Sequence, residues 1–196
     1  PKKNFKLGNN GAGYGAIAGN IKGGLGSASI YVPELDITVG AIAAVNSAGS
    51  LLIPGTKAFY AWDMELENEF GGILPPENFD KAIIAVPKHS SLHENTTLAV
   101  VATDANLTKS ETRRLAIISQ NGLSRAIRPS STPLDGDIVF AISTGEKNID
   151  DKVTKIGTLG AHAANCLGRS VARAVYEAET LGKISSYQDL QDNDEN

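Results

Sequence analysis

The chain has 196 residues and a formal net charge of −4, with 41% hydrophobic residues and a single cysteine, Cys166. This length is enough for one substantial domain with its own core. The acidic balance, without a basic stripe, argues against a nucleic-acid binder, and no apolar run approaches the ~20 residues of a membrane span. A lone cysteine excludes an internal disulfide and a cysteine-based zinc site.

Residues 8–26 are rich in glycine, but their spacing does not fit a phosphate-binding loop. No position satisfies G-x-G-x-x-G, and no Gly-Lys-Ser/Thr triplet ends a P-loop. Glycines permit positive φ and tight packing. We therefore expect this stretch to lie closely against another part of the molecule.

Residues 27–32 and 37–45 predict two strands, and the Pro-Glu-Leu-Asp sequence at 33–36 predicts the turn between them. Asn46 follows the second strand. By composition alone, a turn-forming residue that ends the strand explains Asn at this position as well as a functional role does.

Residues 54–80 predict a loop-like insert, in which residues 62–70 alternate apolar and acidic side chains as an exposed ribbon does. Such an acidic ribbon indicates a solvated face more readily than a contact with a cationic substrate. Residues 81–86 predict a short strand, and the polar linker after it holds His89 and His93. Metal binding would require a helix and a further ligand there, so no metal site is predicted.

Thr96 follows Asn95 directly and begins a run of Thr, Leu, Ala and Val that predicts a strand buried on both faces. If the Thr96 hydroxyl attacks the Asn95 carbonyl, the peptide rearranges to an ester, and water then frees Thr96 as a new N-terminus. Its α-amine, with a pKa of ~7.7–8.0, could act as base for its own hydroxyl. Two ordinary alternatives stand beside this: Thr is a common strand-former, and Asn95–Thr97, like Asn106–Thr108, fits the N-glycosylation sequon.

The remainder of the chain predicts alternating helices and strands. A capping box at residues 108–111 starts a helix that ends at Arg128-Pro129, a strand covers residues 137–144, and residues 185–196 form a polar tail expected to be poorly ordered. Asp135-Gly136-Asp137 is a strong turn signal before that strand. A long helix is expected over residues 151–181, with an apolar face made by Val153, Ile156, Ala163, Leu167, Val171, Ala174 and Ala178.

Several stretches together resemble the DmpA/P1 family of self-processing N-terminal-nucleophile hydrolases. This family includes L-aminopeptidases/D-esterases, β-peptidyl aminopeptidases and nylon-oligomer hydrolases. The resemblance is specific because the matching motifs occur in register along most of the chain. They are Lys-Gly-Gly-Leu-Gly-Ser-Ala-Ser at 22–29, Val-Gly-Ala to Val-Asn at 39–46, Asn-Thr-Thr-Leu-Ala-Val-Val-Ala-Thr-Asp-Ala at 95–105, Arg-Ala-Ile-Arg-Pro at 125–129 and Asp-Gly-Asp-Ile-Val-Phe-Ala at 135–141.

The resemblance implies an α/β fold, a four-layer αββα-like sandwich of the DmpA/ornithine acetyltransferase type. Residues 1–196 would form a single domain, split by self-cleavage into residues 1–95 and a second part of 196 − 95 = 101 residues. Family members are longer, so the chain is expected to be a fragment without the upstream segment that supplies a catalytic Tyr and part of the cleft. The resemblance further implies a homo-oligomer with no cofactor or metal, and the absence of a visible signal favours the cytoplasm.

The resemblance also implies roles for individual residues. Thr96 would be the nucleophile, Asn46 would hold the oxyanion, and Asp135 and Asp137 would position the Thr96 amine. Two departures from the family pattern are visible: Asn20 stands where the family often has Lys, and the His-Thr that precedes the acidic pair in the family is Ser-Thr at 131–132.

The predicted function is therefore amide hydrolysis, as an aminopeptidase or amidase acting on peptides with a free amino end. A first alternative is an endo-hydrolase of 6-aminohexanoate oligomers, favoured by Thr as nucleophile and by Asp-Gly-Asp. Further alternatives are an acetyltransferase of the ornithine acetyltransferase type and an inactive structural subunit. The partner would be a small peptide or amide substrate, with no nucleic acid and no membrane involved.

Overall fold

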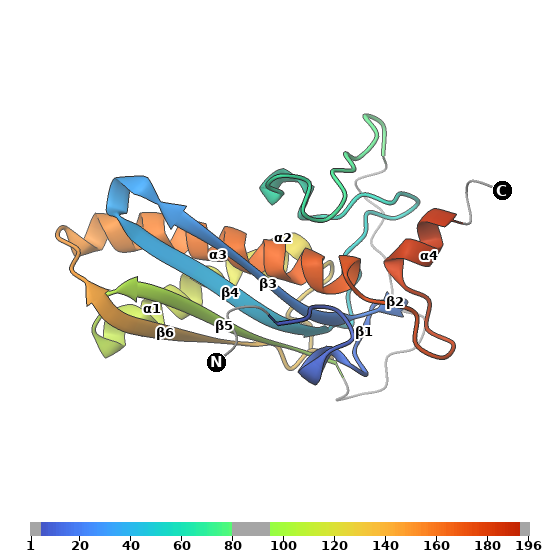
Figure 1. Ribbon diagram of the computed structural model, residues 1–196, viewed down its shortest axis with the longest axis horizontal. Coiled ribbons are helices and arrows are strands. Elements are labelled where there is room, and N and C mark those ends of the chain that lie inside the picture. Colours follow the sequence, from blue (N-terminus) through green and yellow to red (C-terminus); the bar gives the residue numbers. More distant parts are fainter. Residues whose placement is uncertain (1–4, 80–94, 193–196) are drawn as a thin grey trace.

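The computed structural model describes residues 5–79 and 95–192. At its centre lies a four-stranded sheet of order β3-β4-β5-β6, antiparallel except for the parallel pair β5 and β6 (Figure 1). The short strands β1 and β2 form a separate two-stranded ribbon. The strands are β1 (Ile17–Ala18), β2 (Ile21–Lys22), β3 (Gly24–Val32), β4 (Ile37–Asn46), β5 (Thr96–Ala105) and β6 (Ile138–Lys147), and the helices are α1 (Lys109–Ser119), α2 (Asn121–Ala126), α3 (Lys152–Tyr176) and α4 (Tyr187–Asp192).

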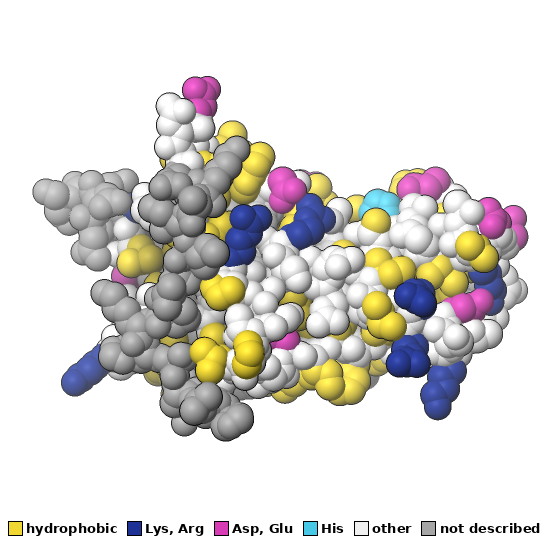
Figure 2. All heavy atoms as spheres, turned by 180° about the vertical axis from the view of Figure 1, so that it is seen from behind, with side chains coloured by type: hydrophobic (Ala, Val, Ile, Leu, Met, Phe, Trp, Pro, Cys, Tyr) yellow, Lys and Arg dark blue, Asp and Glu magenta, His cyan; other side chains and the backbone are white. Residues whose placement is uncertain are grey.

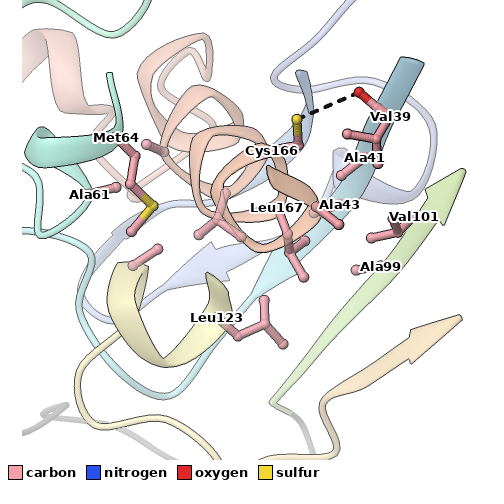
Figure 3. Packing of buried hydrophobic residues seen from close by; sticks show 14 of the residues in the cluster. Val39, Ala41, Ala43, Ala61, Met64, Ala99, Val101, Leu123, Cys166 and Leu167 are labelled. Atoms are coloured by element: carbon pink, nitrogen blue, oxygen red, sulfur yellow. Dashed lines mark hydrogen bonds between the residues drawn. The ribbon is translucent and has the colours of Figure 1, made fainter. Parts of the chain in front are cut away.

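A helical layer covers one face of this sheet. Helix α3 runs along β3 and β4, α1 packs on β6, and α2 packs against α3 (Figure 1). Glycine on β3 permits the close approach, because a Cβ at Gly26 would lie 1.9 Å from the Ser170 carbonyl oxygen on α3. Between the layers is an apolar core in which Leu167 of α3 faces small side chains of β4 and β5, including Ala43 and Ala99 (Figure 3).

The other face of the sheet is open in the described chain. Along β5, Thr97, Ala99, Val101, Thr103 and Ala105 are buried, whereas the residues between them are partly or fully exposed. The expectation that this strand is buried on both faces is therefore wrong for the described residues, which form one sheet layer and one helical layer. Large apolar side chains exposed on the sheet strands are Tyr31, Leu98, Ile138, Phe140 and Ile142.

The glycine-rich segment packs as predicted. A Cβ at Gly13 would lie 2.2 Å from the backbone nitrogen of Leu25, and one at Gly8 would lie 2.1 Å from the Glu177 carbonyl oxygen. The same segment encloses Lys22, which is 1% exposed. Its close packing therefore ties the N-terminal part of the chain to the sheet and to the end of α3.

The expected ribbon at residues 62–70 is wrong. Instead, a 3₁₀ turn (Trp62–Met64) and further turns place Met64 and Phe70 in the core. The acidic side chains of this segment have structural partners: Glu65 accepts hydrogen bonds from the Phe70 and Gly72 amides, and Glu69 forms an ion pair with Arg169. Only Met64 and Phe70 of the apolar positions are buried, whereas Trp62 and Leu66 are exposed, so the alternation does not mark one buried face.

The helices of the C-terminal half depart from prediction in three places, one of which is that α3 ends at Tyr176 and not at residue 181. The capping box at Thr108 is present, but the helix it starts divides at Gln120 into α1 and α2. Helix α2 then packs so closely on α3 that a Cβ at Gly122 would lie 2.2 Å from the Ala164 carbonyl oxygen. Val153, predicted on the apolar face of α3, is 91% exposed because the first turn of the helix lies beyond its buried part.

The tail expected to be poorly ordered from residue 185 forms α4 in its first part. Tyr187 is fully buried, contacts the Phe59 and Tyr176 rings and donates its hydroxyl to the Lys57 carbonyl oxygen. One aromatic residue thus anchors this otherwise polar segment. The strand predicted at 81–86 and the histidines at 89 and 93 lie outside the described residues.

The helical side of the molecule carries charged side chains with apolar ones between them (Figure 2). Within residues 5–79 and 95–192, no helix combines the length and apolar character needed to cross a membrane.

Candidate active site

Thr96 is the first residue of β5 and lies directly opposite Asn46, the last residue of β4. Side chains at opposite positions of an antiparallel pair project from the same face, with Cβ atoms ~4.5–5.5 Å apart. The fold therefore places the predicted nucleophile beside the predicted oxyanion donor, although 50 positions separate them in the sequence.

The Asn46 side chain is oriented by the β1–β2 ribbon. The backbone amide of Ile17 donates to Asn46 Oδ1 at 2.9 Å, so the side-chain oxygen is directed toward β1. The NH₂ group at the other end of the side chain is the hydrogen-bond donor. The carbonyl of the same Ala16–Ile17 peptide accepts a hydrogen bond from Lys22 Nζ at 2.9 Å. The orientation of Asn46 thus depends on a peptide that Lys22 holds in place.

Lys22 itself is enclosed by the glycine-rich segment. Its Nζ donates to the carbonyl oxygens of Gly13, Ala16 and Gly23 at 3.0, 2.9 and 2.6 Å. Burial lowers the pKa of this ammonium group below its usual value. The three carbonyl acceptors offset the loss of water around the charge.

Asp137 comes from the segment that leads into β6. Its Oδ1 accepts a hydrogen bond from the Thr97 amide at 2.7 Å, while Oδ2 is buried and has no hydrogen-bond partner among the described residues; the Thr97 hydroxyl lies nearby but outside hydrogen-bond geometry. Burial raises the pKa of this carboxyl group and the charge of Asp135 adds to that shift, whereas the donors of Thr97 and of the Ser131 backbone oppose it. Asp137 Oδ2, at the start of β5, can thus accept a further hydrogen bond.

Asp135 has different partners. Its Oδ2 accepts hydrogen bonds from the backbone amide and the hydroxyl of Thr132 at 3.0 and 2.7 Å, and its Oδ1 accepts one from the Ala48 amide at 3.2 Å. Three of its roughly four lone-pair positions are used in this way. Asp135 therefore joins the loop before β6 to the chain that leaves β4.

Gly136, between the two acids, lies against the predicted cleavage point. Its amide donates to the Asn95 carbonyl oxygen at 2.8 Å. A Cβ at this position would lie 2.8 Å from Thr96 Oγ1, which only glycine avoids. The side-chain amide nitrogen of Asn95, Nδ2, is buried without a hydrogen-bond partner in the described part of the chain.

Two further contacts fix the loop before β6 to the segment after Asn46. Ser50 and Arg128 exchange backbone hydrogen bonds at 3.0 and 2.9 Å, next to a cis peptide between Arg128 and Pro129. A Cβ at Gly49 would lie 1.9 Å from the Pro129 carbonyl oxygen. These contacts set the position from which the Asp-Gly-Asp segment reaches β5.

All four predicted catalytic residues therefore gather at one end of β5, together with Asn95. Sequence reasoning did not foresee parts played by Ile17, Thr132 and the Gly136 amide, nor the buried position of Lys22. Backbone donors leave no signal in residue types. A glycine between two acids was the one available sign that something approaches the chain closely there.

The described side chains form no metal site. In the ranges 5–79 and 95–192, no three His, Cys, Asp or Glu side chains gather in a way that could hold a metal ion.

Comparison with known proteins gives the family. The model of peptidase family S58 matches residues 1–188. The chain belongs to peptidase family S58. Uncharacterized aminopeptidases of Mycobacterium tuberculosis and Mycobacterium leprae are 38% and 40% identical to it over 94% and 92% of the chain. The chain spans about half the length of these curated relatives, 56% and 52% respectively.

Solved structures place this S58 chain in a known fold. The PH0078 protein of Pyrococcus horikoshii OT3 is 25% identical, with a TM-score of 0.66 over 95% of this chain and 49% of that one. The L-aminopeptidase D-Ala-esterase/amidase of Ochrobactrum anthropi, described as a variant of the Ntn hydrolase fold, has a TM-score of 0.65 at 21% identity and covers 96% of this chain and 52% of its own. A Burkholderia sp. β-aminopeptidase has a TM-score of 0.66 at 21% identity, over 96% and 53%. The predicted resemblance and the predicted α/β fold class of DmpA type are thus confirmed.

Proposed function

We propose that this S58 protein is a self-processing N-terminal-nucleophile hydrolase of amide bonds, in which Thr96 becomes the nucleophile after cleavage of the Asn95–Thr96 bond. The observation that carries the proposal is the pairing at the end of β5. Asn46 on β4 and the Asp135–Asp137 segment before β6 approach Thr96 from its two flanking strands.

Self-cleavage creates the catalytic base. Before cleavage the Thr96 nitrogen is part of a peptide bond and has no basic lone pair. After cleavage it is an α-amine, with an unperturbed pKa of ~7.7–8.0. That amine can take the proton from the Thr96 hydroxyl as it attacks a substrate carbonyl, and return it to the leaving amine.

The carboxylate of Asp137 supports this cycle. Its Oδ2 accepts no hydrogen bond from the described residues, and a newly formed ammonium group at Thr96 would be a donor for it. A hydrogen bond to a carboxylate stabilises the protonated amine and orients it. Asp135 acts alongside by bracing the loop through Thr132 and Ala48.

Asn46 stabilises the tetrahedral intermediate. The Ile17 amide fixes its Oδ1, so its NH₂ group is directed as a donor on the face that carries the Thr96 side chain. Loss of one oxyanion donor typically lowers kcat by about 10²–10³-fold. No metal or organic cofactor takes part in this scheme.

The substrate class is an amide or peptide with a free amino end, which agrees with the aminopeptidase names of the curated relatives. A panel of amino-acyl p-nitroanilides, compared with the same substrates blocked at the amino end and with 6-aminohexanoate oligomers, tests this. Hydrolysis of blocked substrates at the same rate would contradict an aminopeptidase and favour an endo-acting hydrolase.

Replacement of the nucleophile tests self-processing itself. Thr96→Ala should leave a single uncut chain without amidase activity, whereas Thr96→Ser, which keeps a hydroxyl, should still be cut. A cleaved and active Thr96→Ala protein would refute the proposal.

A further inference from the structure

The carbonyl group that self-cleavage would attack already has a backbone donor. Asn95 forms a parallel bridge with Asp135, and the Gly136 amide donates to the Asn95 carbonyl oxygen at 2.8 Å. The same glycine lies against the hydroxyl of Thr96, since a Cβ on it would be 2.8 Å from Oγ1 and 3.7 Å from the Asn95 oxygen. Gly136 is therefore adjacent to both reacting groups.

The direction of this hydrogen bond separates it from Asn46. A backbone carbonyl in a strand points within the sheet toward one neighbour, and the Asn95 oxygen points toward the β6 side, where Gly136 lies. Asn46 pairs with Thr96 from the β4 side. The amide of Asn46 thus lies across the strand from the oxygen that becomes negative during self-cleavage.

We propose that the backbone N–H of Gly136 is the oxyanion donor for self-processing and that Asn46 is the donor for substrate turnover, so that the two reactions use different oxyanion sites. This inference rests on the proposed function and adds to it a residue that acts on the cleavage step alone. A hydrogen bond to a charged oxygen is roughly twice as strong as one to a neutral carbonyl, so the contact is worth more in the intermediate than in the precursor.

The step balances without any added reagent except water. The Thr96 Oγ1 forms a bond to the Asn95 carbonyl carbon, and the hydroxyl proton is transferred to the Thr96 nitrogen. The C–N bond then breaks, leaving an ester and a free amine. Water adds to the ester carbon, the C–Oγ1 bond breaks, and the products are an Asn95 carboxylic acid and a restored Thr96 hydroxyl.

The loop that carries Gly136 is braced before cleavage. Asp135 accepts three hydrogen bonds, two from Thr132 and one from Ala48, and its own amide donates to the Thr132 carbonyl oxygen at 3.0 Å. An oxyanion donor is most effective when it needs no reorganisation during the reaction. These contacts supply that rigidity.

An amide-to-ester replacement at Gly136 tests the donor directly, because it exchanges one N–H for oxygen and adds no side chain. The protein is made at its full natural length by cell-free translation with glycolic acid at this position, and cleavage is followed by intact mass. The control is leucic acid at Leu134, which removes an amide that donates to the Thr132 hydroxyl in the same loop.

The glycolate protein should be cleaved about 10²–10³-fold more slowly than the wild type, with the Leu134 control cleaved at the wild-type rate. Once cleaved, it should hydrolyse substrate at the wild-type rate per cut chain. Asn46→Ala should show the reverse pattern, with normal cleavage and slow turnover.

Three results would overturn the inference: normal cleavage of the glycolate protein, equal slowing of both ester proteins, or slow turnover by glycolate protein that has been cut. If the wild type itself is never cut, the proposed function fails and the inference fails with it. That outcome is distinguishable because it appears without any substitution.

Discussion

Gly136→Ala is the most informative single substitution, because the structure shows what the added methyl group would meet. The new Cβ would lie 2.8 Å from Thr96 Oγ1, closer than side-chain carbons normally approach an oxygen, but 3.7 Å from the Asn95 oxygen and 3.8 Å from Thr96 Cβ, which are ordinary contacts. The φ angle of Gly136 is not in the left-handed region, so alanine is tolerated by the backbone itself. Only the Thr96 hydroxyl has to move.

The expected effect is therefore large on reactivity and small on stability. Overpacking of this kind typically costs about 1–3 kcal/mol in fully packed cores, and the exposed position of Gly136 puts it at the low end. A displacement of about 1 Å at a reacting group can cost on the order of 10²-fold in rate. We expect cleavage at Asn95–Thr96 to slow by about that factor, with a change in Tm of only a few degrees.

The assay follows the intact mass of the full-length protein with time after synthesis, together with thermal unfolding of the same sample. Gly157→Ala is the matched control, because a Cβ at Gly157 on α3 meets nothing within 4 Å. It should cleave at the wild-type rate and gain up to about 1 kcal/mol in helix stability. Cleavage of Gly136→Ala at the wild-type rate, with Tm unchanged, would refute the placement of the hydroxyl.

Three further substitutions test other parts of the site. Asp137→Asn should abolish processing yet leave the protein equally or more stable at pH 7. The pKa of Asp137 is raised in the folded state. The contribution of this carboxyl group to stability is therefore fully present below the unfolded-state pKa and is lost as the pH rises through the folded-state pKa. Thermal unfolding of variant and wild type should thus converge below pH 3.8, the usual pKa of the group, and a deficit of the variant that persists at pH 7 would contradict this. Lys22→Met should lower the free energy of unfolding by about 2 kcal/mol in urea titrations, since three carbonyl groups lose a charged donor while one buried charge is removed. An unchanged free energy of unfolding would argue against the three hydrogen bonds to the Lys22 ammonium group. Thr132→Val keeps the shape but removes the hydroxyl that holds Asp135, so it should cost about 1 kcal/mol and slow cleavage, whereas unaltered cleavage kinetics would show that the brace is dispensable.

The sequence could predict the parts of the fold that depend on local patterns. The strands at 27–32, 37–45 and 96 onward follow from β-branched runs between turn residues, and the capping box at Thr108 from Ser/Thr followed by Glu. The segment at 62–70 could not be predicted in this way. Its acidic residues look solvent-facing, but Glu69 has its partner, Arg169, 100 positions away on α3.

In the site, the candidate side chains could be predicted from the sequence, whereas the backbone contacts could not. Thr96, Asn46, Asp135 and Asp137 could be identified by their motifs, and the fold brings them to one end of β5. Asp135 and Asp137 have different hydrogen-bond partners, and these depend on which donors the loop presents to each. The Gly136 amide carries no side-chain signature, so its contact with the Asn95 carbonyl became visible only in three dimensions.

The central claim is that Thr96 obtains a free amino group by cleavage of the bond that precedes it. N-terminal sequencing of freshly purified, hydrolytically active protein tests this most directly. The account predicts a terminus that begins Thr-Thr-Leu-Ala-Val, at Thr96. An active protein in which every Asn95–Thr96 bond is intact would contradict it.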